Sequence, residues 1–293
     1  MGGRRNILNI PGSLALYLSA ALFSFTSLFV KLASPYYSGL FVSASRFAIG
    51  AALCLAVLFR RYGGIKPVKP AYLLMRGLFG SVSMIASYAA ISLTGPGRAV
   101  LLSNTYPLFV AVFGALFFGE LFKPRTAASI AICTAGAFLV VRDGSGAALA
   151  GDLLALGSAL LAGAAVNFVR RASQFDNPFL IYLSPCLLGL PLFAFAPLPA
   201  SSGGAAGLGF LLGVGLLAFL AQALMAYGYR SVPAAKGSVV FYAETALTVL
   251  LGALFAGESF TARFAAGFAL ILAGLWLNQS RLGPGRGRAG RAA

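Results

Sequence analysis

The sequence predicts an all-α membrane protein with ten transmembrane helices, arranged as two inverted five-helix repeats. Three observations predict this fold. Hydrophobic residues make up 59% of the chain and charged residues only 10%, whereas a soluble domain has about 45–50% apolar and about 25% charged residues. Ten apolar runs approach the length of about 20 residues that spans a bilayer as a helix. A sequence motif also occurs twice, at a spacing close to half of the 293-residue chain.

The expected helices follow one another with short connections. They are placed at residues 13–32, 38–59, 71–93, 98–118, 126–141, 152–169, 178–196, 207–228, 236–256 and 262–279. Proline lacks a backbone N–H and interrupts a helix, so Pro107 predicts a break in the helix at 98–118. The helix at 178–196 is short and carries Pro185 and Pro191, and repeated glycines in the helix at 207–228 allow close packing between helices.

The repeat sets the domain organisation. Residues 114–120 (GALFFGE) recur as 252–258 (GALFAGE), and this shift of 138 residues holds without a gap to Gly136 and Gly274. Five spans per copy is an odd number, so the second copy is expected to be inverted in the membrane. The expected divisions are an N-terminus at 1–12, repeats at 13–142 and 152–279, a linker at 143–151 and a basic tail at 280–293.

The net charge of +16 reports membrane topology. With the N-terminus in the cytoplasm, sixteen Lys and Arg residues fall on the cytoplasmic side, and four fall outside. This asymmetry follows the positive-inside rule and predicts a multi-pass protein of the cell (inner) membrane with both termini cytoplasmic. The lipid bilayer therefore explains the basic charge, and no nucleic-acid partner is expected. The first apolar run is too long for a cleaved signal peptide.

Several short motifs carry a resemblance to a known family. They are Arg46-Phe47, Tyr88-Ala-Ala-Ile, Pro107-Leu108 and Gly119-Glu120 with Gly136, and in the second copy Tyr242-Ala-Glu244, Gly257-Glu258 and Gly274. Over about residues 13–279 this pattern resembles proteins of the drug/metabolite transporter superfamily that contain two EamA-type domains. The resemblance implies a carrier that moves a small organic solute without ATP. Thr245 replaces Pro107 in the second copy, so the helix at 236–256 is expected to be less kinked.

A carrier of inverted repeats binds its solute near the membrane midplane, between the repeats. Glu244 is the one acidic residue well inside an expected span, and a buried carboxylate there predicts contact with solute or a coupling proton. Its alternative role is a structural bond to Arg46 or to a helix backbone. Arg46 is the natural counter-charge to Glu244. Its alternative is a structural role at the start of its helix. Arg76, near a helix end, is expected to extend to the cytoplasmic headgroups.

Further polar and aromatic residues of the central helices complete the expected solute-binding set, although any one of them has packing as its alternative. They are Tyr88, Asn104, Tyr106, Asn167, Gln222, Tyr227 and Tyr242. Together they favour an amphiphilic or partly aromatic organic solute. Glu120 and Glu258 end the repeated motif at the membrane surface, where each is expected to cap the helix that follows it.

The sequence gives little support for a metal site, a cofactor, ATP hydrolysis or enzymatic catalysis. The three cysteines are isolated and histidine is absent, so neither a metal site nor a cofactor is expected. The chain lacks a Walker A pattern and a nucleophile beside a base. We therefore expect not an enzyme but a secondary transporter, acting as monomer or homodimer by alternating access, with export favoured and with proton coupling or exchange. The alternative is a membrane-embedded lipid-modifying enzyme or accessory subunit. A channel is disfavoured because no ring of charges is present.

Overall fold

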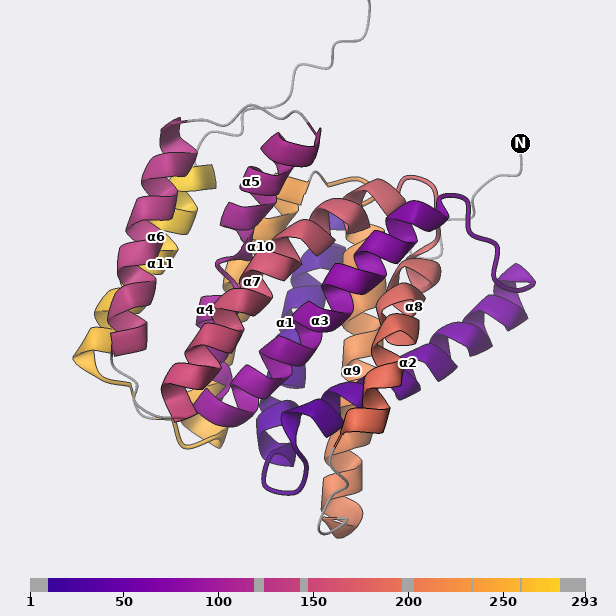
Figure 1. Cartoon of the computed structure of the whole chain (residues 1–293), viewed down its shortest axis with the longest axis horizontal. Coiled ribbons are helices and arrows are strands. Elements are labelled where there is room, and N and C mark those ends of the chain that lie inside the picture. Colours follow the sequence, from indigo (N-terminus) through magenta and orange to yellow (C-terminus); the bar gives the residue numbers. More distant parts are fainter. Residues whose placement is uncertain are drawn as a thin grey trace, which may run out of the picture.

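The computed structural model describes residues 10–118, 124–142, 147–196, 203–232, 234–258 and 260–279. These residues form helices throughout, and no strand occurs among them. The elements, drawn in Figure 1, are α1 (Gly12–Ala33), α2 (Gly39–Tyr62), α3 (Pro70–Thr94), α4 (Pro96–Ser103), α5 (Tyr106–Phe118), α6 (Pro124–Arg142), α7 (Ala147–Ala172), α8 (Pro178–Gly189), a 3-10 helix (Leu190–Phe195), α9 (Gly204–Gly228), α10 (Ala234–Phe255) and α11 (Ala262–Gln279).

The apolar helices match the ten expected spans. Six segments are long and apolar enough to cross a membrane, if α4 and α5 are taken together, and shorter apolar stretches lie in α6, α8, α10 and α11. Large apolar side chains face outward, including Phe117, Phe255 and Trp276, which are 57%, 63% and 68% exposed. Lipid rather than water is the solvent that favours such a surface. The prediction of an all-α membrane fold is confirmed.

The expected break in the fourth span is present between α4 and α5. The helix stops at Ser103, where Asn104 forms the C-cap, and it resumes at Tyr106 with Pro107 in its first turn. In the second repeat, Thr245 stands at the position of Pro107, and α10 runs through it without interruption. The expectation of a straighter helix there is confirmed. The difference arises because threonine keeps the backbone N–H that proline lacks.

The inverted arrangement is visible in the contact between α6 and α11, the last helices of the two repeats, which lie side by side at one edge of the molecule (Figure 1). A methyl group added to Gly136 would lie 2.8 Å from the carbonyl oxygen of Gly267, and one added to Gly274 would lie 3.1 Å from that of Ser129. A shift of 138 residues converts the first contact into the second. Residue numbers rise along α6 as they fall along α11, so the two copies run in opposite directions.

A second pair of equivalent contacts contributes to the interface between the repeats. Helix α3 of the first repeat packs along α7 of the second, as Figure 1 shows, and α1 packs along α9 in the same way. Helix α7 is the copy of α1 in the second repeat, and α9 is the copy of α3. The α3–α7 and α1–α9 contacts are therefore equivalent under the repeat. The centre of the molecule therefore lies between the two repeats.

Some expected features fall at or beyond the limits of the described residues. Helix α7 begins at Ala147, within the segment expected to link the repeats. Glu120, the N-terminal residues 1–9 and the basic tail at 280–293 lie outside the described residues.

Candidate functional site

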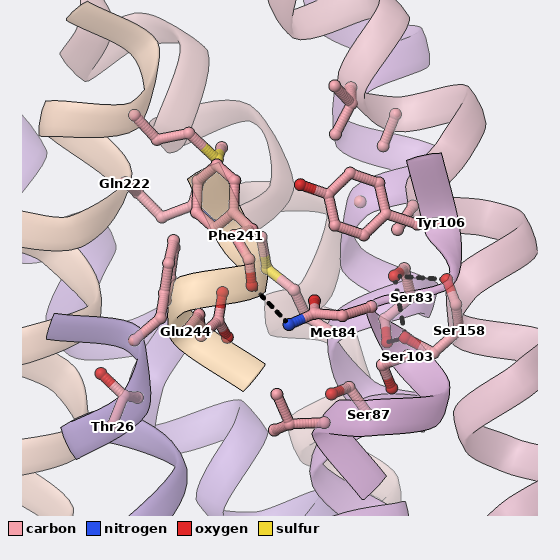
Figure 2. A pocket seen from close by; sticks show the side chains of 18 of the residues that line it. Thr26, Ser83, Met84, Ser87, Ser103, Tyr106, Ser158, Gln222, Phe241 and Glu244 are labelled. Atoms are coloured by element: carbon pink, nitrogen blue, oxygen red, sulfur yellow. Dashed lines mark hydrogen bonds between the residues drawn. The ribbon is translucent and has the colours of Figure 1, made fainter. Parts of the chain in front are cut away.

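A cavity of about 150 Å³ lies at the centre, between the two repeats. Helices α1, α2, α3, α4, α5, α7, α9 and α10 contribute to its wall. Six of the nine residues expected to bind solute line it, namely Arg46, Tyr88, Asn104, Tyr106, Gln222 and Glu244. Figure 2 shows Glu244 and Gln222 on one side of this space and Tyr106 on the other. The volume is sufficient for on the order of ten water molecules.

Glu244 lies in the middle of α10, with 9% of its surface exposed. Its backbone carbonyl accepts a hydrogen bond from the Ser24 hydroxyl of α1 at 3.1 Å, and the Asn104 side chain lies beside its carboxyl group. Within the described part of the chain, Glu244 forms no ion pair with Lys or Arg. The structure therefore does not contain the Glu244–Arg46 bond that we considered as an alternative, and the carboxyl group faces the cavity.

The break between α4 and α5 positions a polar side chain in the site. Asn104, only 6% exposed, donates from Nδ2 to Thr245 Oγ1 at 2.8 Å and to the Phe241 carbonyl at 3.3 Å. Both acceptors belong to α10 of the other repeat. The span interrupted between α4 and α5 thus bonds to its uninterrupted counterpart, beside Glu244.

Arg46 extends from α2 into the same space and is 2% exposed. Its guanidinium carbon lies 5.0 Å from the ring centre of Tyr88 and 5.8 Å from that of Tyr182, which is the geometry of cation–π contacts. The aromatic faces stabilise the charge, but they do not accept all of its N–H groups. Nε and Nη2 of Arg46 have no hydrogen-bond partner.

Arg76 corrects a prediction. We expected it to reach the headgroups, but it is 2% exposed and lines the cavity from α3. Its Nη2 donates to Gln222 Oε1 at 3.1 Å, and its Nε has no partner. The guanidinium lies where a side chain at Gly80, one helical turn further along α3, would stand. An arginine followed four residues later by glycine is the sequence signal that could have indicated this placement.

Serines that the sequence analysis did not single out join the two repeats across the cavity wall. The Ser83 hydroxyl donates to the Ser158 carbonyl at 3.0 Å, and the Ser158 hydroxyl donates to the Ser83 carbonyl at 2.9 Å. The pair is drawn in Figure 2 and connects α3 to α7. Reciprocal bonds of this kind satisfy both hydroxyls and hold the helices together.

Two of the expected residues lie elsewhere, and the side chain of a third is outside the described part of the structure. Asn167 donates to the carbonyls of Val110 and Gly163, both at 3.1 Å, and so connects α7 to α5 away from the cavity. The Tyr227 hydroxyl donates to the Ile10 carbonyl at 3.4 Å, near the start of the described chain. The side chain of Tyr242 lies outside the described part of the structure.

Polar contacts between repeats lie at one end of the cavity, near the start of α4. Arg98 forms a two-pronged ion pair with Asp152 of α7, at 2.7 and 2.6 Å. The Glu258 carboxyl accepts from the Gly97 amide at 3.0 and 3.3 Å. Partial burial raises the pKa of Glu258 from 4.5 to about 7, although the Gly97 hydrogen bond and the charge of Lys31 oppose this rise.

The contact of Glu258 corrects a second prediction. Glu258 caps a helix, as expected, but that helix is α4 of the other repeat rather than α11. The start of α11 is capped instead by Thr261, whose hydroxyl accepts from the Phe264 amide at 3.1 Å. A carboxylate is favourable at a helix start because the first amides have no partner within the helix.

The opposite end of the molecule has its own polar contacts. Asp176 accepts from the backbone amides of Val68 at 2.7 Å and Lys69 at 3.2 Å, just before α3. Arg170 donates to the Tyr229 carbonyl at 2.9 Å, after the end of α9. Among the described residues, no group of three His, Cys, Asp or Glu side chains could hold a metal ion.

Two inverted helical repeats around a central cavity lined by buried charged side chains define a class of membrane transport proteins. The chain belongs to the EamA-like transporter family, which matches residues 10–142 and 149–279. Members and relatives are named as transporters, which decides against the alternative of a membrane-embedded enzyme.

Named relatives differ in how much of their length is shared. The chain is 30% identical over 189 residues to solute carrier family 35 member G1 of Mus musculus and spans only 51% of that relative. It is 27% identical over 277 residues to the riboflavin transporter of Rhizobium johnstonii, covering 90% of this chain and 89% of that protein. It is 26% identical over 268 residues to the pseudopaline exporter CntI of Pseudomonas aeruginosa, covering 89% and 93%.

A protein of known crystal structure has the same fold. The two structures align with a TM-score of 0.65 over 92% of this chain and 99% of the other, at 21% sequence identity.

Proposed function

We propose that this transporter is a secondary carrier that moves a small organic solute across the cell membrane by alternating access. The observation that carries the proposal is the central cavity, which lies between two oppositely oriented repeats and is lined by buried charged side chains, Glu244, Arg46 and Arg76. Polar contacts between distant segments lie at either end of the molecule. Opening one set while the other stays closed would expose the cavity to one side at a time.

The topology and direction are part of the same proposal. The protein lies in the inner membrane with both termini on the cytoplasmic side, because this placement puts most Lys and Arg residues on that side. Repeats at 13–142 and 152–279 act as the two moving halves. Export is the favoured direction, and one relative that matches along nearly its whole length is named as an exporter.

Glu244 is the residue that couples transport to protons in this proposal. It is the one acidic side chain that lines the cavity among the described residues. A carboxyl group that is protonated in one state and contacts solute in the other allows proton and solute to move in exchange. Under such coupling, a gradient of one pH unit drives about a tenfold solute gradient, because one unit equals about 1.4 kcal/mol.

Transport in proteoliposomes tests the proposal. A panel of labelled metabolites, with riboflavin among them, is screened for uptake with and without a pH gradient. A carrier gives saturable flux that accelerates when unlabelled solute is present on the far side, whereas flux that rises without limit would indicate a channel. If no member of a broad metabolite panel shows saturable counterflow, the proposed function is wrong.

A substitution tests the role of Glu244 within that assay. Glu244→Gln preserves the size of the side chain but cannot release a proton, so we expect the protein to fold and insert while its flux no longer responds to the pH gradient. Leu250→Ala is the matched control, because Leu250 lies on the same helix and is 53% exposed to lipid. Unchanged uptake kinetics in the glutamine variant would remove Glu244 from the mechanism.

A further inference from the structure

Two arginines in the cavity lack the counter-charges that buried cations normally have. Arg46 and Arg76 are each 2% exposed and line the same cavity. Glu244 is the one acidic residue among the described lining residues, and it pairs with neither. The contacts that the arginines make, with the rings of Tyr88 and Tyr182 and with the amide of Gln222, are all to uncharged groups.

Unused hydrogen-bond donors accompany this excess of charge. Nε and Nη2 of Arg46 and Nε of Arg76 have no acceptor, although they are buried. Leaving a buried charged donor unsatisfied costs several kcal/mol, and a guanidinium keeps its charge in proteins. The rings of Tyr88 and Tyr182 stabilise the charge of Arg46 but accept no hydrogen bond from its Nε or Nη2. The edge of a guanidinium matches the paired oxygens of a carboxylate or phosphate.

If Arg46 and Arg76 had a purely structural role, their N–H groups would be expected to donate to acceptors within the protein. Arg98 illustrates that case in the same protein, since it meets both carboxylate oxygens of Asp152 and a backbone carbonyl as well. Arg46 and Arg76 instead place positive charge in the wall of the central cavity. Gly80 lets the Arg76 guanidinium lie against its own helix, because any larger residue there would occupy its place.

We propose that the transported solute carries an anionic oxygen group, a carboxylate or a phosphate, that binds between Arg46 and Arg76. This inference rests on the proposed function and names the class of solute for it. The remainder of the solute faces Glu244, Asn104 and Tyr106, which offer a proton, an amide and an aromatic face. Solutes that are only cationic or only neutral leave the two arginines without a counter-charge and are excluded.

Ligand-dependent thermal stability tests this inference independently of transport. The purified full-length protein is heated with a dye that fluoresces on reaction with thiols, because Cys54, Cys133 and Cys186 are free, buried and exposed only on unfolding. Benzoate and benzamide form a matched pair that differs in charge but hardly in shape. Inorganic phosphate distinguishes a phosphate site from a carboxylate site. The comparison within the unmodified protein needs no variant to fold.

At about 10 mM, we expect benzoate or phosphate to raise the unfolding midpoint by about 2 °C or more, while benzamide leaves it unchanged. Arg46→Gln and Arg76→Gln should each abolish the shift. Arg61→Gln is the matched control, since Arg61 is exposed at the end of the helix that carries Arg46, and it should retain the shift.

Equal stabilisation by benzamide and benzoate would overturn the inference, as would the absence of any shift with benzoate and phosphate alike. A shift that persists in both arginine variants would also overturn it, because the anion would then bind elsewhere. The outcomes distinguish this inference from the proposed function. Stabilisation by anions without saturable flux would support the anion site and reject the carrier function. Saturable flux without any preference for anions would support the carrier function and reject the anion site.

Discussion

Replacing Glu258 by glutamine should change how the stability of the protein depends on pH. The carboxyl group of Glu258 lies among Gly95, Gly97 and Gly252, where no larger side chains fit, and it accepts the Gly97 amide. Burial raises its pKa from 4.5 to about 7. Between these values the folded protein holds a proton that the unfolded chain releases. The stability from this proton is fully present below pH 4.5 and is lost as the pH rises to about 7.

The size of the effect follows from the pKa change. A rise from 4.5 to about 7 corresponds to about 3 kcal/mol at about 1.4 kcal/mol per unit. Glu258 is partly exposed, so solvent screening reduces the expected difference to about 1–2 kcal/mol. Glutamine resembles the protonated carboxyl group and does not titrate. The curves of the two proteins should therefore agree in shape below pH 4.5 and separate towards pH 7, with the wild type losing more stability.

The assay is thermal unfolding in detergent at a series of pH values, with the same thiol-reactive dye. We expect the wild-type midpoint to fall by a few degrees more than that of Glu258→Gln across this pH range. Glu258→Ala is the control for loss of the cap, because it leaves the Gly97 amide without its acceptor at every pH and lowers stability by about 1–3 kcal/mol. Parallel curves for wild type and the glutamine variant would refute the reasoning.

Two further substitutions test the arginines that the fold buries. The Gly80→Ala variant should fold, because alanine favours a helix and the new methyl group meets only the flexible end of the Arg76 side chain. The methyl group should displace Arg76 from Gln222 and so reduce solute flux. Normal flux kinetics in this variant would contradict that placement. Asp152→Asn removes the counter-charge of Arg98 and should destabilise the protein by about 3 kcal/mol, measured as a lower unfolding midpoint. An unchanged midpoint would show that this ion pair does not hold the repeats together.

The broken helix shows what could be predicted locally. Pro107 lacks a backbone N–H and lies in the first turn of α5, so α4 and α5 were predictable as halves of one span. Thr245 at the equivalent site likewise predicted a continuous α10. The placement of Asn104 beside Glu244 was predictable in outline, because a break near the midplane commonly marks the site in inverted-repeat carriers.

Capping and burial were harder to predict, because they depend on distant segments. Glu258 was expected to cap the next helix in the sequence, but it accepts a hydrogen bond from the Gly97 amide of the other repeat. Arg76 lies near a helix end, which favoured an interfacial position, yet Gln222 of α9 and the gap at Gly80 hold it in the cavity. Asn167 has the polarity of a site residue but bonds to the backbone of α5.

The sequence by itself determined that this chain crosses a membrane as helices in two opposed copies. Hydrocarbon offers no hydrogen bonds, so long apolar runs must satisfy their backbone internally, and an odd number of spans in each copy inverts the second. Only the tertiary structure decided which polar side chains meet at the centre. In lipid, the outward and inward faces of a helix are both apolar, so hydrophobic periodicity does not show which face turns inward, and packing between the repeats makes that choice.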